Sequence, residues 1–167
     1  MRLLMVCALL AGLVIPGTQV MAQSSESQLQ TAYCTYADDS EISVRYDASG
    51  KNKEEPKNGK LWEPGGSAMT LYTQGPVLLK QVEIPVGAFM VYVVPGKKEW
   101  TLVVNKNVTA GSKYEEAQDL VRAPMELGDL NPPVKPLQVV LAHMAPKTCT
   151  LRLYYGSVGA QVDFVEK

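Results

Sequence analysis

Residues 82–106 constrain the fold more than any other segment, and they read V-E-I-P-V-G-A-F-M-V-Y-V-V-P-G-K-K-E-W-T-L-V-V-N-K. In residues 88–94, apolar side chains occupy alternate positions on both faces of a strand. This pattern is typical of a strand that is covered on both faces or lies under a long loop. After a turn at 95–99, Trp100, Leu102 and Val104 share one face of the next run. The segment predicts two neighbouring core strands.

Short alternating runs, separated by Gly, Pro, Asp and Asn, continue through most of the chain. They predict further strands at 33–37, 41–46, 68–74, 77–84, 119–127, 137–144, 148–155 and 158–165. Only residues 113–119 suit a helical turn. We therefore expect one all-β domain over residues 33–167, an antiparallel β-sandwich of about ten strands with little helix.

The first 22 residues have the features of a cleaved signal peptide. Arg2 precedes an apolar run at 3–15, Pro16 and Gly17 end it, and small residues precede a cleavage point after Ala22. The run is shorter than the roughly 20 apolar residues that span a bilayer, so we expect no membrane span in the mature chain. Residues 23–32 lack a hydrophobic pattern and predict a flexible leader. A secreted or periplasmic protein is expected.

The charge balance excludes some partners. Loss of residues 1–22 removes one base and no acid, so the formal charge moves from −1 to −2. This balance favours neither nucleic acid nor an anionic membrane surface. The densest charges lie in the loop at 47–60, where mixed signs predict a solvated segment.

Cys34 and Cys149 remain after cleavage, and an even pair in an exported chain predicts a disulfide. Cys149 shares a strand face with Leu151 and Leu153, while Thr150 and Arg152 point the other way. The bond would close a loop of about 115 residues. By reducing the entropy of the unfolded chain, it would stabilise the fold by roughly 4–5 kcal/mol. Two buried free thiols are the alternative.

Several motifs occur in a fixed order: I-P-V-G-A-F-M-V-Y-V-V-P at 84–95, W-T-L-V-V-N-K at 100–106, D-L-V-R at 119–122 and C-T-L-R-L at 149–153. Over most of residues 33–166 the chain resembles a family of exported bacterial proteins known as a domain of unknown function, numbered twenty-nine eleven. The resemblance implies a compact, β-rich, extracytoplasmic domain without an assigned activity.

The chain departs from the pattern of that family at two places. Where the family has V-W-R-T-G-A-N-E-A-T, residues 61–70 read L-W-E-P-G-G-S-A-M-T, so Glu63, Ser67 and Ala68 replace Arg, Asn and Glu. A Trp-Glu pair of the family aligns with Tyr155-Gly156. If those polar groups form a ligand site in the family, the resemblance implies that segment 62–70 has lost or altered it here.

The residues offer little catalytic chemistry. His143 has no placed partner and is expected to pack at the end of a strand, on the parity of Leu141. No His or Cys spacing predicts a metal site, and no motif predicts a cofactor. Asp119 and Arg122 are three residues apart and could pair, but on a strand they would lie on opposite faces, so we expect independent surface roles.

Aromatic side chains give the main ligand hypothesis. Three aromatic residues lie in or beside loops, or at strand positions whose side chains point outward: Trp62, Tyr72 and Tyr154. Exposed aromatic side chains of this kind stack on sugar rings or on the side chains of partners. Ordinary loop packing is the alternative. We expect a non-catalytic binding or structural and interaction module, whose partner is a carbohydrate or another exported protein. The alternative is an extracytoplasmic hydrolase with a loop-built carboxylate site at Glu63 or Asp119.

Overall fold

The computed structural model describes residues 29–50, 55–109 and 111–167. The expected signal peptide, most of the leader and part of the charged loop lie outside these residues; residues 55–60 of that loop are largely exposed. The strands are β1 (Leu29–Thr35), β2 (Glu41–Asp47), β3 (Met69–Thr73), β4 (Val77–Leu79), β5 (Val82–Ile84), β6 (Gly87–Val94), β7 (Trp100–Asn105), β8 (Asp119–Ala145) and β9 (Thr148–Glu166). Two short 3-10 turns are present, η1 (Pro64–Gly66) and η2 (Glu116–Gln118).

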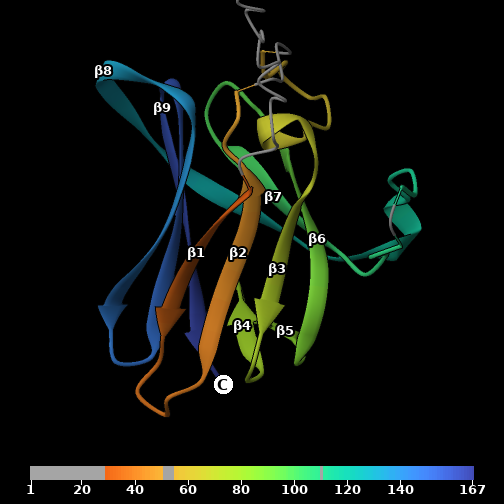
Figure 1. Ribbon diagram of the computed structural model, residues 1–167, viewed down its shortest axis with the longest axis vertical. Helices are drawn as coiled ribbons and strands as arrows, with labels where there is room; N and C mark the ends of the chain where they lie inside the picture. The colour runs from red at the N-terminus through yellow and green to blue at the C-terminus, as the bar shows by residue number, and fades with distance from the viewer. Residues whose placement is uncertain (1–28, 51–54, 110) are drawn as a thin grey trace, which may run out of the picture.

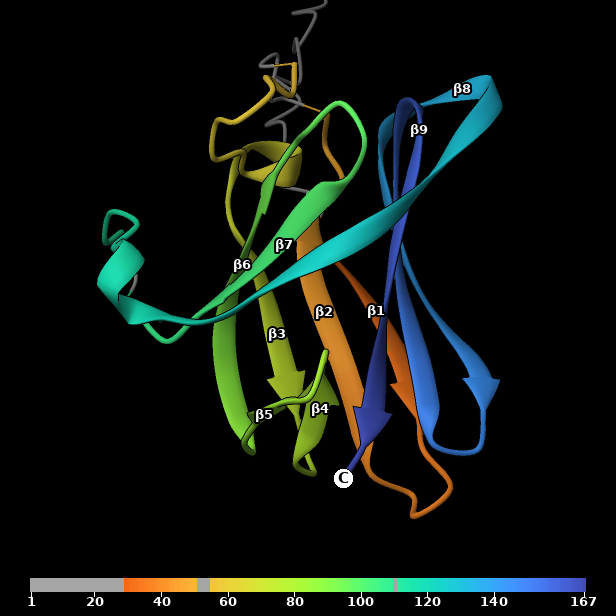
Figure 2. The ribbon, with the colours of Figure 1, turned by 180° about the vertical axis from the view of Figure 1, so that it is seen from behind.

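All nine strands belong to one antiparallel sheet in the order β1-β2-β3-β6-β7-β8-β9-β4-β5. Figure 1 shows β1, β2, β3 and β6 in one layer and most of β8 and β9 in the other. From behind, β7 and the beginning of β8 cross between these layers (Figure 2). The predicted all-β antiparallel class is confirmed. Its two layers belong to one continuous sheet because β8 pairs with β7 at its start and with β9 thereafter.

Strands β8 and β9 are assigned as continuous, where the sequence predicted two strands each. In β8, the ladder to β9 shifts register between Asp129 and Gln138, around the predicted proline-rich connection. In β9 the Thr150 hydroxyl donates a 2.5 Å hydrogen bond to Asp163. Thirteen extended residues would span about 43 Å, so the chain must reverse, as predicted, near Gly156, whose φ is +58°. The two halves of β9 therefore lie side by side.

Other boundaries differ from the prediction for local reasons. The predicted strand at 77–84 is a tight hairpin of β4 and β5, since Lys80 and Gln81 adopt positive φ values of 48° and 72°. Strand β1 begins at Leu29, so the last four residues of the expected leader are strand. The hairpin of β1 and β2 is confirmed, and Asp38 accepts a hydrogen bond from the Ser40 amide in its turn.

The core lies between the two layers and includes a disulfide. Cys34 of β1 and Cys149 of β9 are bonded, with their Cα atoms 6.1 Å apart, which confirms the predicted pair. The predicted coverage of both faces of β6 is also observed: Val91 and Val93 are fully buried, while Tyr92 on the other face packs against Tyr114 of the loop after β7. No helix within the described ranges has the length and apolarity needed to cross a bilayer.

Candidate functional site: a groove on the outer face of β8 and β9

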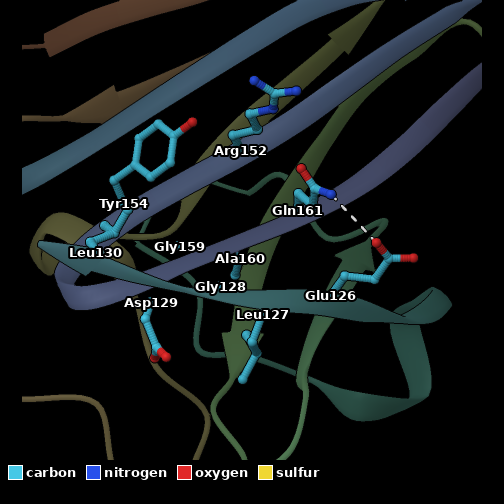
Figure 3. A pocket seen from close by; sticks show the side chains of 10 residues that line it. All are labelled: Glu126, Leu127, Gly128, Asp129, Leu130, Arg152, Tyr154, Gly159, Ala160 and Gln161. Atoms are coloured by element: carbon cyan, nitrogen blue, oxygen red, sulfur yellow. Dashed lines mark hydrogen bonds between the residues drawn. The ribbon is translucent and has the colours of Figure 1, made fainter.

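A groove of about 380 Å³ lies on the surface where three stretches of chain run side by side. Residues 126–130 of β8, 152–154 in the first half of β9 and 159–161 in its second half form it (Figure 3). The groove faces away from the core, because Leu151 and Leu153, which alternate with Arg152 and Tyr154, are fully buried on the inner side. Its lining is Glu126, Leu127, Gly128, Asp129, Leu130, Arg152, Tyr154, Gly159, Ala160 and Gln161.

Two glycines leave the floor of the groove open. Gly128 and Gly159 face each other directly in the antiparallel register of β8 and β9. A Cβ atom built on Gly128 meets no atom within 4 Å, so it would project into open space. Successive side chains of a strand alternate between faces, and in Figure 3 the side chains of Leu127 and Asp129 point to the opposite side of β8 from the groove. The hollow exists because this pair lacks side chains.

Tyr154 forms one wall. A Cβ atom on Gly159 would lie 3.3 Å from Cδ1 of Tyr154 and 3.5 Å from Cδ2 of Leu130. Because Gly159 has no side chain, the ring of Tyr154 packs over the neighbouring strand, with Leu130 beside it. This packing restricts the ring before any ligand arrives, which lowers the entropy cost of binding.

Polar side chains line the rest of the groove. The Arg152 guanidinium donates from Nη2 to the Sδ atom of Met144 at 3.3 Å, and its Nε is buried without a hydrogen-bond partner among the described residues. On the neighbouring strands, Nε2 of Gln161 donates to Glu126 across 3.4 Å, as the dashed line in Figure 3 shows. Arg152 therefore brings charged N–H donors to the lining of the groove.

The groove combines side chains of several chemical kinds. It brings together an aromatic wall, a guanidinium, an amide and a carboxylate. Across the part of the chain that the structure describes, no group of three or more His, Cys, Asp or Glu side chains is arranged to hold a metal ion.

The other two predicted aromatic residues do not join Tyr154. Trp62 is 5% exposed and packs against Trp100 and Tyr155, with ring centroids 5.7 and 5.1 Å apart. Its expected exposure is wrong, because its backbone pairs with Val93 and draws the indole into the core. Tyr72 is 41% exposed on β3, where its register partners are Ser43 and Ala88. A common platform of the three residues is therefore not formed.

Residues 63–70, which follow Trp62, border a different cavity. This second cavity, of about 460 Å³, is lined by Glu63, Gly66, Ser67, Ala68, Thr70, Met90, Tyr92, Val108, Thr109, Gly111 and Ser112. The contact between Trp62 and Tyr155 also brings segment 61–70 and residues 155–156 together in space. The sequence could not reveal this proximity, because the two places are separated by most of the domain.

Asp119, a candidate of the hydrolase hypothesis, is held as a hydrogen-bond acceptor beside that cavity. Its oxygens accept from Nδ2 of Asn105 at 2.8 Å, from the hydroxyl of Tyr114 at 2.7 Å and from Nε of Arg122 at 2.8 Å. The expected independence of Asp119 and Arg122 is wrong. Strict alternation fails here because Asp119 follows η2 and the ladder to β7 has a register shift at Asn105.

The tyrosines near the two candidate carboxylates remain protonated at neutral pH. Burial, then the hydrogen bond to Asp119, raise the pKa of Tyr114 to about 12. Burial also raises the pKa of Tyr92, and the charges of Glu63 and Asp119 raise it further. Both hydroxyls therefore act as hydrogen-bonding groups and not as bases.

His143 is exposed, and its expected packing is wrong. It pairs with Cys149 in the register of β8 and β9, but the buried stretch of β8 ends at Leu141. The side chain therefore extends past the core.

The sequence also missed most of the groove. Arg152 and Tyr154 occupy alternate positions of a strand, which indicates that they point to the same outer face. No local pattern indicated that Gly128 would lie opposite Gly159.

No curated protein and no solved structure matched. A family model described as "Protein of unknown function (DUF2911)" matches residues 27–164, and the chain therefore belongs to this family.

Proposed function

We propose that this chain is a non-catalytic, extracytoplasmic binding protein whose groove on β8 and β9 takes a saccharide. One observation carries the proposal: the ring of Tyr154 and the guanidinium-bearing side chain of Arg152 border a floor of two glycines. An aromatic wall beside fixed polar groups in a hollow of this size is the usual composition of a small-molecule site.

The chemistry of a sugar ring matches these groups. The C–H face of a pyranose packs on an aromatic side chain, and its hydroxyls both donate and accept hydrogen bonds. Arg152 and the amide of Gln161 supply donors, while Glu126 supplies an acceptor. The near-balance of charge among these groups favours a polar ligand of low net charge. An exported protein partner fits less well, since the hollow is small and polar and partner anchors are commonly large and apolar.

The proposed location rests on two supports. The leading 22 residues have the composition of a signal peptide, and the bond between Cys34 and Cys149 is compatible with an oxidising compartment. Exported binding proteins meet saccharides in that compartment.

A glycan array tests the function. Labelled mature protein is expected to retain a restricted set of saccharides, and Gly128→Val is expected to lose them, because the added side chain fills the floor without a clash. Valine suits an exposed strand position, so the fold should persist. Absence of any retained saccharide, or equal retention by Gly128→Val, would contradict the proposal. If instead an exported protein is captured through this face, the ligand class is wrong.

Tyr72→Ala serves as the matched control for Tyr154→Ala. Tyr72 is also a partly exposed tyrosine on a strand, but it lies outside the groove lining. We expect Tyr154→Ala to abolish retention on the array and Tyr72→Ala to leave it unchanged.

A further inference from the structure

The outer face of the layer that contains β1, β2 and β3 carries a pair of exposed tyrosines (Figure 1). Tyr33 of β1 pairs in register with Ser43 of β2, and Ser43 pairs with Tyr72 of β3. The tyrosine row formed by these three residues points away from the core, because Val44 and Leu71 on the alternate positions are fully buried. Tyr33 is 65% and Tyr72 is 41% exposed. Both rings are therefore open to a partner.

The tyrosine row leaves a gap above its middle residue. Residues that pair across antiparallel strands have Cα atoms about 5 Å apart, so the Cα atoms of Tyr33 and Tyr72 lie about 10 Å apart. The short side chain of Ser43 cannot fill that distance. Surfaces on which aromatic rings border a shallow groove are those on which proline-rich segments dock.

Two residues of opposite charge lie at the ends of this gap. Glu41 and Arg45 flank Ser43 at the next outward positions of β2, one on each side. Neither side chain makes an ion pair with another described residue. Asp47, farther along β2, accepts a hydrogen bond from the Ser49 amide at 2.7 Å. A partner that runs along β2 therefore meets a carboxylate at one end of the gap and a guanidinium at the other.

The spacing of these charges matches an extended proline-rich segment. Four residue steps of a strand span about 13 Å, and four steps of a polyproline II helix span about 12 Å. A segment with an acidic and a basic residue four positions apart can place its acid over Arg45 and its base over Glu41. Its prolines then lie between the two tyrosines. Because such a segment is already extended when free, it loses little conformational entropy on binding.

We propose that the tyrosine row, with Glu41 and Arg45 at its ends, docks a proline-rich segment of a partner protein that carries an acidic and a basic residue four positions apart. The row shares no residue with the lining of the saccharide groove or of the second cavity. The inference does not depend on the saccharide proposal, and either one can fail while the other stands.

The test titrates acetyl-Glu-Pro-Pro-Pro-Lys-amide into the mature ¹⁵N-labelled protein and follows amide resonances. The proline peptide is expected to shift the amides of Tyr33, Ser43 and Tyr72 and to leave those of Gly128 and Gly159 unchanged. The matched control acetyl-Glu-Gly-Gly-Gly-Lys-amide keeps both charges but has no rings, and it should bind about tenfold more weakly. Acetyl-Gln-Pro-Pro-Pro-Gln-amide lacks the charges and should bind roughly fivefold more weakly.

Three variants assign the binding to this face. Tyr33→Ala and Tyr72→Ala should each weaken binding of the proline peptide about tenfold. Tyr154→Ala, which alters a partly exposed tyrosine in the groove, should leave it unchanged. If a variant of the row does not fold, Ser43→Val replaces it, since valine suits a strand and fills the gap while both rings remain.

Three outcomes would overturn the proposal. They are equal binding of the proline and glycine peptides, shifts confined to the groove, and undiminished binding of the proline peptide in folded Tyr72→Ala. Shifts of the same amides with protein concentration alone would assign the face to a second copy of the chain and would also exclude this partner class.

Discussion

The two faces of the first half of β9 have opposite roles. Cys149, Leu151 and Leu153 point inward and are fully buried, while Arg152 and Tyr154 on the alternate positions point outward and are partly exposed. The inward face makes the disulfide and the core contacts. The outward face borders a hollow. Stability and the proposed binding are therefore assigned to alternate residues of one strand, and substitutions should separate them.

The largest expected effect comes from the inward face. Replacing both Cys34 and Cys149 by Ala should lower the free energy of unfolding by about 4–5 kcal/mol, since the bond closes a loop of 115 residues. Urea unfolding measures this loss. Where the variant is folded, saccharide binding should persist. A loss of less than about 1 kcal/mol would show that packing alone holds β1 against β9.

Leu153→Ala tests the same face without the covalent bond. Leu153 is fully buried, and its truncation should cost about 2–5 kcal/mol because a cavity remains. Its neighbour supplies the control: Tyr154→Ala should cost less than about 1 kcal/mol, as expected for a partly exposed position. Equal losses of unfolding free energy in the two variants would show that the two faces contribute equally to stability.

Binding should respond in the reverse order. Tyr154→Ala should weaken saccharide binding by roughly tenfold or more, the scale of an aromatic anchor. Gly159→Ala should have a smaller effect, because its Cβ would press on Cδ1 of Tyr154 from 3.3 Å. Isothermal titration with a saccharide selected on the array measures both. A wild-type affinity in Tyr154→Ala would exclude the ring from the site.

The smallest effect concerns a cluster outside both faces. Tyr114 donates to Asp119, and Tyr114→Phe should cost about 1 kcal/mol at pH 7. Because folding raises the pKa of Tyr114 to about 12, the unfolded chain loses this proton first as the pH rises. The contribution of Tyr114 is therefore complete below pH 10 and is lost between about pH 10 and pH 12.

The free energy of unfolding of wild type and Tyr114→Phe is measured across this pH range. Saccharide binding of both proteins is measured at pH 7. The difference in stability between the two proteins should shrink as the pH rises. A difference that grows instead would contradict the direction of the shift, and altered saccharide binding would connect the cluster to the groove.

Local sequence patterns predicted the scaffold well. Alternation placed Cys149, Leu151 and Leu153 inward, and the parity of the cysteines predicted the bond. The patterns failed where distant segments meet. The burial of Trp62 depends on Val93 and Tyr155, and the groove depends on the register that opposes Gly128 and Gly159. Strand alternation favoured independent roles for Asp119 and Arg122 over an ion pair, because a local pattern does not reveal the register shift at that point.

We propose that the outward face of β9 binds a ligand independently of the fold that the inward face maintains. In Gly128→Val, saccharide affinity and urea midpoint are measured on the same preparation. We expect affinity to be lost while the midpoint stays at or above that of the wild type, since the new side chain enters open space. Wild-type affinity in this variant, with the groove filled, would show that the groove is not the binding site.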